Sequence, residues 1–276
     1  MRTQLLALDL DGTLLGHDNT LREVDVRAIA AARAAGIAVT LATGRLAAGA
    51  LPTARALGLS TPLVCSDGAV VIESPSGEVV YQHYLEARLI EEVTHALGDH
   101  ALHAFWFSHD EIVGEEGAGA LRSFVETWSP RLTFHPRLIG SSAWETRHTV
   151  SMAAGIGPRE GVERIVEQLV VRHGKAVQVA TFPAWRSDQW TVLIRSAHVD
   201  KATGLSQVAQ RLGITAREVA VVGDWHNDVP MFRWAGRSFA MGQSSPEVAQ
   251  HATDRLSTDH RQGGGVAEAI ARLLAG

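Results

Sequence analysis

A chain of 276 residues is long enough to bury a sizeable core and to form two domains. Apolar residues make up 46% of it, which is typical of a globular protein and excludes a disordered one. The formal net charge of −5 argues against a nucleic-acid or anionic-membrane partner, because either would need a basic surface.

The cysteine content and the start of the chain bear on its location. Cys65 is the only cysteine, so no internal disulfide is expected, which fits a reducing compartment. The chain reaches Asp9 too soon for a signal peptide, and no run of about 18 apolar residues predicts a membrane span. The sequence therefore predicts a cytoplasmic protein and leaves the oligomeric state open.

The first predicted element is an apolar strand over residues 5–8, which leads directly into Asp9-Leu10-Asp11-Gly12-Thr13. An unbroken apolar run is typical of a strand that is buried on both faces of a parallel sheet. Asp9 and Asp11 are two residues apart, so an extended backbone would point both carboxylates the same way. Such a repulsive pair is usually tolerated where a cation or a reaction needs it. The alternative is a hairpin turn, which Asp-Gly between apolar residues also favours.

Helices and strands alternate after this first strand. The spacing predicts helices over 22–35 and 46–57 and strands over 37–42 and 62–65. This alternation indicates an α/β fold with a doubly wound, Rossmann-like parallel sheet. In such sheets the chemistry lies beyond the carboxyl ends of the strands, where Asp9, Thr43 and Asp67 fall.

The pattern changes in the middle of the chain. Residues 70–73 and 79–84 flank Pro75-Ser76-Gly77 and predict a β-hairpin. Residues 85–194 mix predicted helices and strands, and we expect them to form an inserted α+β domain whose aromatic residues are mostly core. The α/β core domain is therefore expected to comprise residues 1–84 and 195–276.

The α/β alternation resumes with a predicted helix that starts at Asp200-Lys201. A buried strand over 218–222 follows and ends in Gly223-Asp224-Trp225-His226-Asn227-Asp228. A short helix, a strand and a terminal helix are expected over 229–235, 237–241 and 266–274.

The polar groups at these strand ends form a chemically consistent set. Carboxylate oxygens suit Mg²⁺, which favours one or two carboxylates together with a phosphate. The Lys201 ammonium suits a phosphate oxygen, and the Thr43 hydroxyl at a strand-to-helix junction would donate to the same group. The plainer alternatives are a helix N-cap for Thr43 and for Asp224 and an exposed helix residue for Lys201, and the site roles are favoured over them.

Together, these segments resemble the four motifs of the haloacid dehalogenase superfamily, and more narrowly those of its Cof-type, class IIB phosphatases. The matching segments are Asp9-Leu10-Asp11-Gly12-Thr13-Leu14, Thr43-Gly44-Arg45, Lys201 and Gly223-Asp224-Trp225-His226-Asn227-Asp228. The resemblance covers the whole chain. It implies that residues 85–194 are a C2-type cap, which fits the long segment between Thr43 and Lys201.

The resemblance implies a Mg²⁺-dependent phosphatase that acts on a small phosphorylated metabolite, such as a sugar phosphate. Asp9 would be the nucleophile that becomes an aspartyl phosphate, and Asp11 would act as general acid and base. The residues implied to contact the phosphate or the rest of the substrate are Thr43, Gly44, Arg45, Asp67 and Lys201. The residues implied at the Mg²⁺ site are Asp9, Asp11 (through its backbone carbonyl), Asp224 and Asp228.

Two other functions stay open at the level of sequence. A phosphosugar mutase similar to phosphomannomutase would have the same arrangement of motifs and domains. Such an enzyme would have to keep the sugar phosphate bound and turn it over within the site. A non-catalytic module that binds a phosphorylated metabolite is the other alternative, and the intact motif set speaks against it. The chain departs from the subfamily at Asp67 and Gln243, where asparagine is usual, and the first departure bears on the substrate.

Overall fold

The computed structural model describes residues 2–16, 18–184, 188–259 and 261–275. The chain divides into two compact units, which are described one at a time. The first comprises Met1–Gly44, Ala50–Tyr81 and Asp200–Gly276, and the second comprises Arg45–Gly49 and Gln82–Val199. The role of the second unit as a cap stays a prediction. Within the described ranges, no helix is long and apolar enough to cross a membrane.

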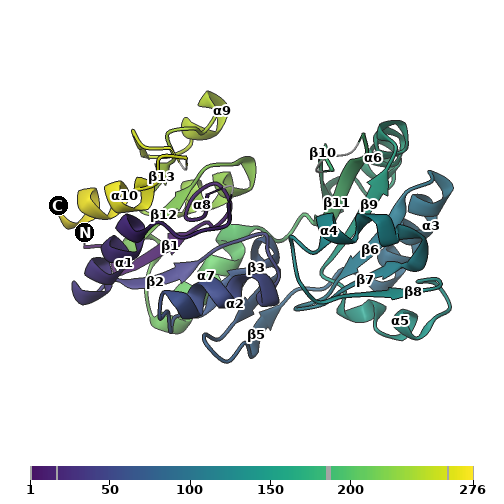
Figure 1. The fold of residues 1–276 in the computed structure, drawn as a ribbon, viewed down its shortest axis with the longest axis horizontal. Helices are drawn as coiled ribbons and strands as arrows, with labels where there is room; N and C mark the ends of the chain where they lie inside the picture. Colours follow the sequence, from purple (N-terminus) through teal and green to yellow (C-terminus); the bar gives the residue numbers. More distant parts are fainter. Residues whose placement is uncertain (1, 17, 185–187, 260, 276) are drawn as a thin grey trace. The chain divides into compact units, whose positions relative to one another are not determined.

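The first unit is built on a parallel five-stranded sheet (Figure 1). Its strand order is β14 (Asp254–Arg255), β13 (Arg237–Ala240), β12 (Val219–Gly223), β1 (Leu5–Leu8) and β2 (Ala38–Leu41). In the register, Leu5 of β1 lies between Val219 and Ala38. The predicted α/β fold with a parallel sheet is therefore confirmed.

Both faces of this sheet are covered. Leu5 and Ala7 join a buried cluster with apolar residues of α7 and α8. Leu6 and Leu8 point to the opposite face and are also fully buried. The helices of this part of the chain are α1 (Glu23–Ala34), α2 (Ala47–Ala56), α7 (Lys201–Leu212), α8 (Val229–Trp234), α9 (Pro246–Ala249) and α10 (Gly265–Leu274).

The third strand differs from the expectation. β3 (Leu63–Cys65) does not continue the five-stranded sheet but forms a small sheet with β4 (Val70–Ile72) and β5 (Val79–Gln82). One parallel bridge, Ala42 to Val64, links it to the end of β2. The chain reverses within the 3₁₀ turn η1 (Ser66–Gly68), so β4 runs back antiparallel to β3. The alternation of elements indicated the strand but not this reversal.

The second unit holds a six-stranded sheet that is antiparallel except at one edge. Its order is β10 (Val177–Pro183), β11 (Trp190–Ser196), β9 (Met152–Gly157), β6 (His103–Phe107), β7 (Ile112–Glu115) and β8 (Leu132–His135), with β7 and β8 parallel. Its helices are α3 (Ala87–Asp99), α4 (Arg122–Val125), α5 (Ser142–Glu145) and α6 (Arg159–His173). The short elements β8 and α5 have no counterpart in the sequence-based expectation.

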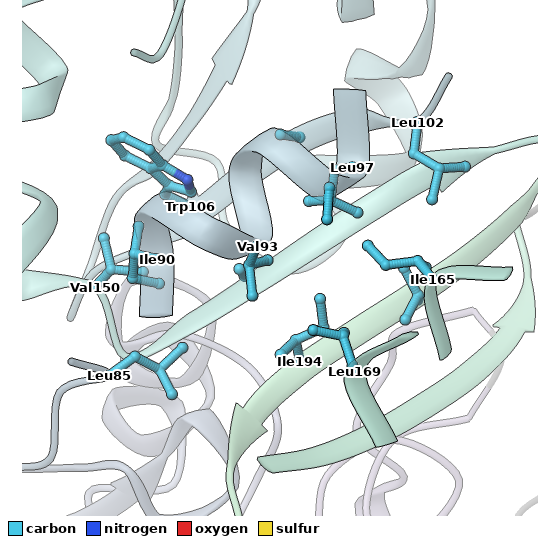
Figure 2. Packing of buried hydrophobic residues seen from close by; sticks show 14 of the residues in the cluster. Leu85, Ile90, Val93, Leu97, Leu102, Trp106, Val150, Ile165, Leu169 and Ile194 are labelled. Carbon is cyan, nitrogen blue, oxygen red and sulfur yellow. The ribbon is translucent and has the colours of Figure 1, made fainter. Parts of the chain in front are cut away.

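An apolar core holds α3 and α6 on this sheet. Figure 2 shows Val93 and Leu97 of α3 close to Ile165 of α6 within one buried cluster. β9 contributes Gly155, where an added Cβ would lie 2.1 Å from Leu97 Cδ2. A larger residue there would force the buried Leu97 side chain to move, so glycine suits this close packing. Trp106 is buried here and donates from Nε1 to Thr94 Oγ1 at 2.9 Å, so it is core as expected.

Candidate active site

The candidate site lies in the first unit, at the carboxyl end of the parallel sheet. Asp9 follows β1, Asp224 follows β12, and Lys201 is the first residue of α7. The Asp9 amide donates to the Val222 carbonyl at 3.0 Å, so the β1–β12 pairing extends to the site itself. The Asp200 carboxylate accepts a bond from the Thr203 amide at 2.8 Å, and this cap fixes where α7 and Lys201 begin.

Lys201 is the only buried cation among these residues. Its Nζ donates to Asp9 Oδ1 and to Asp228 Oδ1, both at 2.6 Å, and its side chain is fully buried. Burial alone would lower the pKa of Lys201, but the charges of Asp228 and Asp9 raise it above its usual value. The lysine therefore stays charged and compensates two buried carboxylates.

The ionised form of Asp9 remains unfavourable despite this contact with Lys201. Burial raises its pKa well above the usual value, and the charges of Asp228 and Asp224 raise it further against the opposing effect of Lys201. Asp224 behaves similarly, since burial and the charge of Asp228 raise its pKa to about 6. The site therefore holds more negative charge than one lysine can neutralise.

Asp228 shapes the loop that carries Asp224. Its Oδ2 accepts bonds from the amides of Asp224 at 2.8 Å and Trp225 at 3.0 Å, while Oδ1 accepts from Lys201. Both oxygens are thus engaged by protein donors. This arrangement favours an orienting role for Asp228 over direct contact with a metal.

The carboxylates have the chemistry of a divalent-cation site. Oxygen atoms of Asp9, Asp224 and Asp228 all lie within 4.8 Å of one another. Gly12 has a φ of +85°, and a Cβ there would lie 2.6 Å from Asp224 Oδ2. Glycine therefore avoids both backbone strain and a clash with the Asp224 carboxylate. Hard oxygen donors and excess negative charge fit Mg²⁺. The exposed Asp11 carboxylate is outside this cluster, and its contact through the backbone carbonyl stays a prediction.

The proposed phosphate-binding loop lies beside η1. Thr43 is fully buried, and its carbonyl accepts a bond from the Asp67 amide at 3.0 Å. A Cβ on Gly44 would lie 3.4 Å from Asp67 Oδ1, so this loop and the Asp67 carboxylate are in contact. Arg45 is half-buried and belongs to the second unit, so its role toward a substrate stays a prediction.

Three further side chains take part to which the sequence analysis assigned no role. Thr13 Oγ1 donates to Asp224 Oδ1 at 3.1 Å, and Asn227 Nδ2 donates to Asp67 Oδ1 at 2.8 Å. Gln243 Nε2 donates to the Gly12 carbonyl at 2.5 Å. Each lies in or beside a motif, but the motif pattern does not indicate which partner its side chain meets.

A family model for haloacid dehalogenase-like hydrolases matches residues 6–270. The chain belongs to this family. Among curated members of the family, the pyridoxal phosphate phosphatase YbhA of Escherichia coli is 26% identical over 91% of this chain and 92% of that protein. A phosphoglycolate phosphatase of Archaeoglobus fulgidus is 26% identical over 98% and 96%. An HMP-PP phosphatase of Escherichia coli is 29% identical over 89% and 86%.

Solved structures of the family share the fold of this hydrolase. A haloacid dehalogenase-like hydrolase from Bacteroides thetaiotaomicron superposes with a TM-score of 0.82 at 24% identity and covers 99% of this chain and 100% of its own. A subclass IIB sugar phosphatase gives a TM-score of 0.78 at 18% identity, with 98% of each chain covered.

Proposed function

We propose that this hydrolase is a Mg²⁺-dependent phosphatase that hydrolyses a small phosphorylated metabolite through an aspartyl phosphate at Asp9. The observation that carries the proposal is the buried contact of Lys201 with Asp9 and Asp228, next to Asp224. This contact supports the proposal because a nucleophile, a cation for phosphoryl oxygens and a carboxylate pair for a metal would then share one site. The relatives' names support the substrate class, since each refers to a small phosphorylated compound.

In the first step, a carboxylate oxygen of Asp9 attacks phosphorus and the ester P–O bond breaks. Lys201 binds Asp9 Oδ1, which orients Oδ2 as the attacking atom. Asp11 gives its proton to the departing oxygen, so the product leaves as an alcohol. The exposure of Asp11 is consistent with this role, because the acid must exchange protons with water.

In the second step, water gives a proton to Asp11 while its oxygen attacks the phosphorus of the aspartyl phosphate. The bond between phosphorus and the Asp9 oxygen breaks, phosphate leaves, and the Asp9 carboxylate is restored. Lys201 and Thr43 hold the phosphoryl oxygens in both steps. Asp9, Asp224 and the Asp11 carbonyl would hold Mg²⁺, which when bound neutralises charge between carboxylate and phosphate.

Release of inorganic phosphate from a panel of monoesters tests this function. The panel includes p-nitrophenyl phosphate, pyridoxal phosphate, phosphoglycolate and a sugar bisphosphate. We expect hydrolysis with Mg²⁺ and none after EDTA treatment, and calorimetry should show Mg²⁺ binding that weakens in Asp224→Asn. Transfer between hydroxyls of the bisphosphate without phosphate release would indicate a mutase instead. Binding of the esters without turnover would indicate a binding module. A cytoplasmic location stays a prediction.

A further inference from the structure

We propose that Gln243 is a positioning residue that sets how tightly the candidate site binds a divalent cation. It acts through the carboxylate of Asp224 and the turn at Gly12 rather than as a ligand of the cation. This inference rests on the Mg²⁺ site of the proposed phosphatase and assigns a further residue to that site.

The backbone around Gln243 is held at the same edge of the sheet as the candidate site. Gln243 follows shortly after β13, which ends at Ala240. Arg255 Nη2 donates to the carbonyls of the two neighbouring residues, to Gly242 at 2.9 Å and to Ser244 at 3.0 Å. These two bonds fix the peptide groups on both sides of Gln243. Its side chain therefore starts from a defined position.

The side-chain amide of Gln243 serves two acceptors that lie next to each other. Its Nε2 donates to the Gly12 carbonyl at 2.5 Å. It also bonds the Asp224 carboxylate: burial and the charge of Asp228 raise the pKa of Asp224, whereas bonds from Thr13 and Gln243 lower it. An amide nitrogen carries two hydrogens, so one glutamine can bond both acceptors at once. Gln243 thus joins the turn after β1 to the acid after β12.

Thr13 completes this network from the other side. It follows Gly12 in the chain, and its hydroxyl donates to Asp224 Oδ1 at 3.1 Å. The Asp224 carboxylate is therefore oriented by two donors, of which one belongs to the turn and the other also holds that turn. A carboxylate has about four lone-pair sites, so two such bonds still leave room for a cation.

The network joins two of the groups that are proposed to hold Mg²⁺. The Asp11 carbonyl lies in the peptide group directly before Gly12, and Asp224 supplies a carboxylate oxygen. Gln243 contacts both segments and so limits how far these two groups can move apart. Partners that orient a metal-binding group in this way typically contribute about 10–100-fold to metal affinity.

Calorimetric titration with Mg²⁺ alone tests this role. Gln243→Met keeps the length and apolar stem of the side chain and removes both donors, so it should raise the Kd for Mg²⁺ by about tenfold. The kcat for p-nitrophenyl phosphate at saturating Mg²⁺ should stay within about twofold of the wild-type value, because the residue acts on cation binding. A purely structural role would not produce this separation.

Gln250→Met is the matched control. Gln250 is exposed, and its Nε2 donates to the Glu247 carbonyl at 2.9 Å, so the substitution also removes a bond from a glutamine to the backbone. No residue of the candidate site takes part in that bond. The Kd for Mg²⁺ should therefore stay at the wild-type value.

The outcomes separate this inference from the proposed function. A folded Gln243→Met that binds Mg²⁺ as tightly as Gln250→Met overturns the role of Gln243 and leaves the phosphatase intact. A kcat that saturating Mg²⁺ does not restore also overturns it. A wild-type protein that binds Mg²⁺ but hydrolyses no ester defeats the proposed function, and the comparison of Kd values still decides this inference. A wild-type protein that binds no Mg²⁺ defeats both. If Gln243→Met does not fold, Gln243→Ala removes the same donors and the same criteria apply.

Discussion

Both units have apolar cores, but the candidate site of the first unit buries charged side chains as well. In the first, the sheet ends in a cluster where Lys201 contacts Asp9 and Asp228 away from water. In the second, α3 and α6 meet the sheet through apolar residues, and the tightest approach is between Leu97 and Gly155. Stability at the first location thus depends on charge compensation, and at the second on volume. The first unit thus carries an electrostatic cost at its candidate site.

Removal of the compensating cation should have the largest effect on stability. Lys201→Met keeps most of the volume but leaves Asp9 and Asp228 buried without a partner ammonium. Loss of one member of a buried ion pair costs about 3–5 kcal/mol, which urea denaturation at neutral pH would measure. Lys175→Met is the matched control, because Lys175 is exposed, and its effect should stay below about 0.5 kcal/mol. Equal effects of the two substitutions would refute charge compensation at Lys201.

In the second unit, the addition of a single methyl group should lower the free energy of unfolding. In Gly155→Ala the new Cβ would overlap Leu97 Cδ2, and overpacking of this kind costs about 1–3 kcal/mol. In the double variant with Leu97→Ala, the loss in urea denaturation should be smaller than the sum of the two single losses, because the added methyl then has room. Gly98→Ala provides the control, since nothing lies within 4 Å of the added Cβ and alanine favours the helix. If Gly155→Ala is as stable as Gly98→Ala, the close packing of α3 on β9 is wrong.

A smaller effect, dependent on pH, is expected at Glu268 of α10. Partial burial would raise its pKa, but bonds from the amides and hydroxyls of Ser257 and Thr258 lower it from 4.5 to about 2. A lowered pKa means that the stabilisation is complete above about pH 4.5 and is lost as the pH falls through about 2.

The substitution Glu268→Gln should therefore destabilise the protein by about 1 kcal/mol at pH 7, and the difference from wild type should shrink as the pH falls below 4.5. Urea denaturation across this pH range gives the comparison. Glu247→Gln alters an exposed residue of α9 and should show no such trend. A difference that does not change with pH would contradict the role of the ionised Glu268.

The contrast between the units also explains what the sequence could predict. Asp9 and Asp224 could be placed together because parallel strands end at one edge of a sheet, and this rule needs no side-chain detail. The bond from Asn227 to Asp67 depends on the reversal at η1, which alternation of elements does not reveal. The strand β8 and the helix α5 each have four residues, which is too short for a periodic signal.

Turnover of Asp9→Asn in the presence of Mg²⁺ tests the central claim most directly. The variant keeps an oxygen that can accept from Lys201 but lacks a nucleophilic carboxylate, so phosphate release from p-nitrophenyl phosphate should fall by roughly 10³-fold or more. Its free energy of unfolding should not fall below that of the wild type, because burial opposes the ionised form of Asp9. Asp99→Asn, at an exposed residue of α3, should retain full turnover. A folded Asp9→Asn that keeps a tenth of wild-type turnover would contradict attack by Asp9.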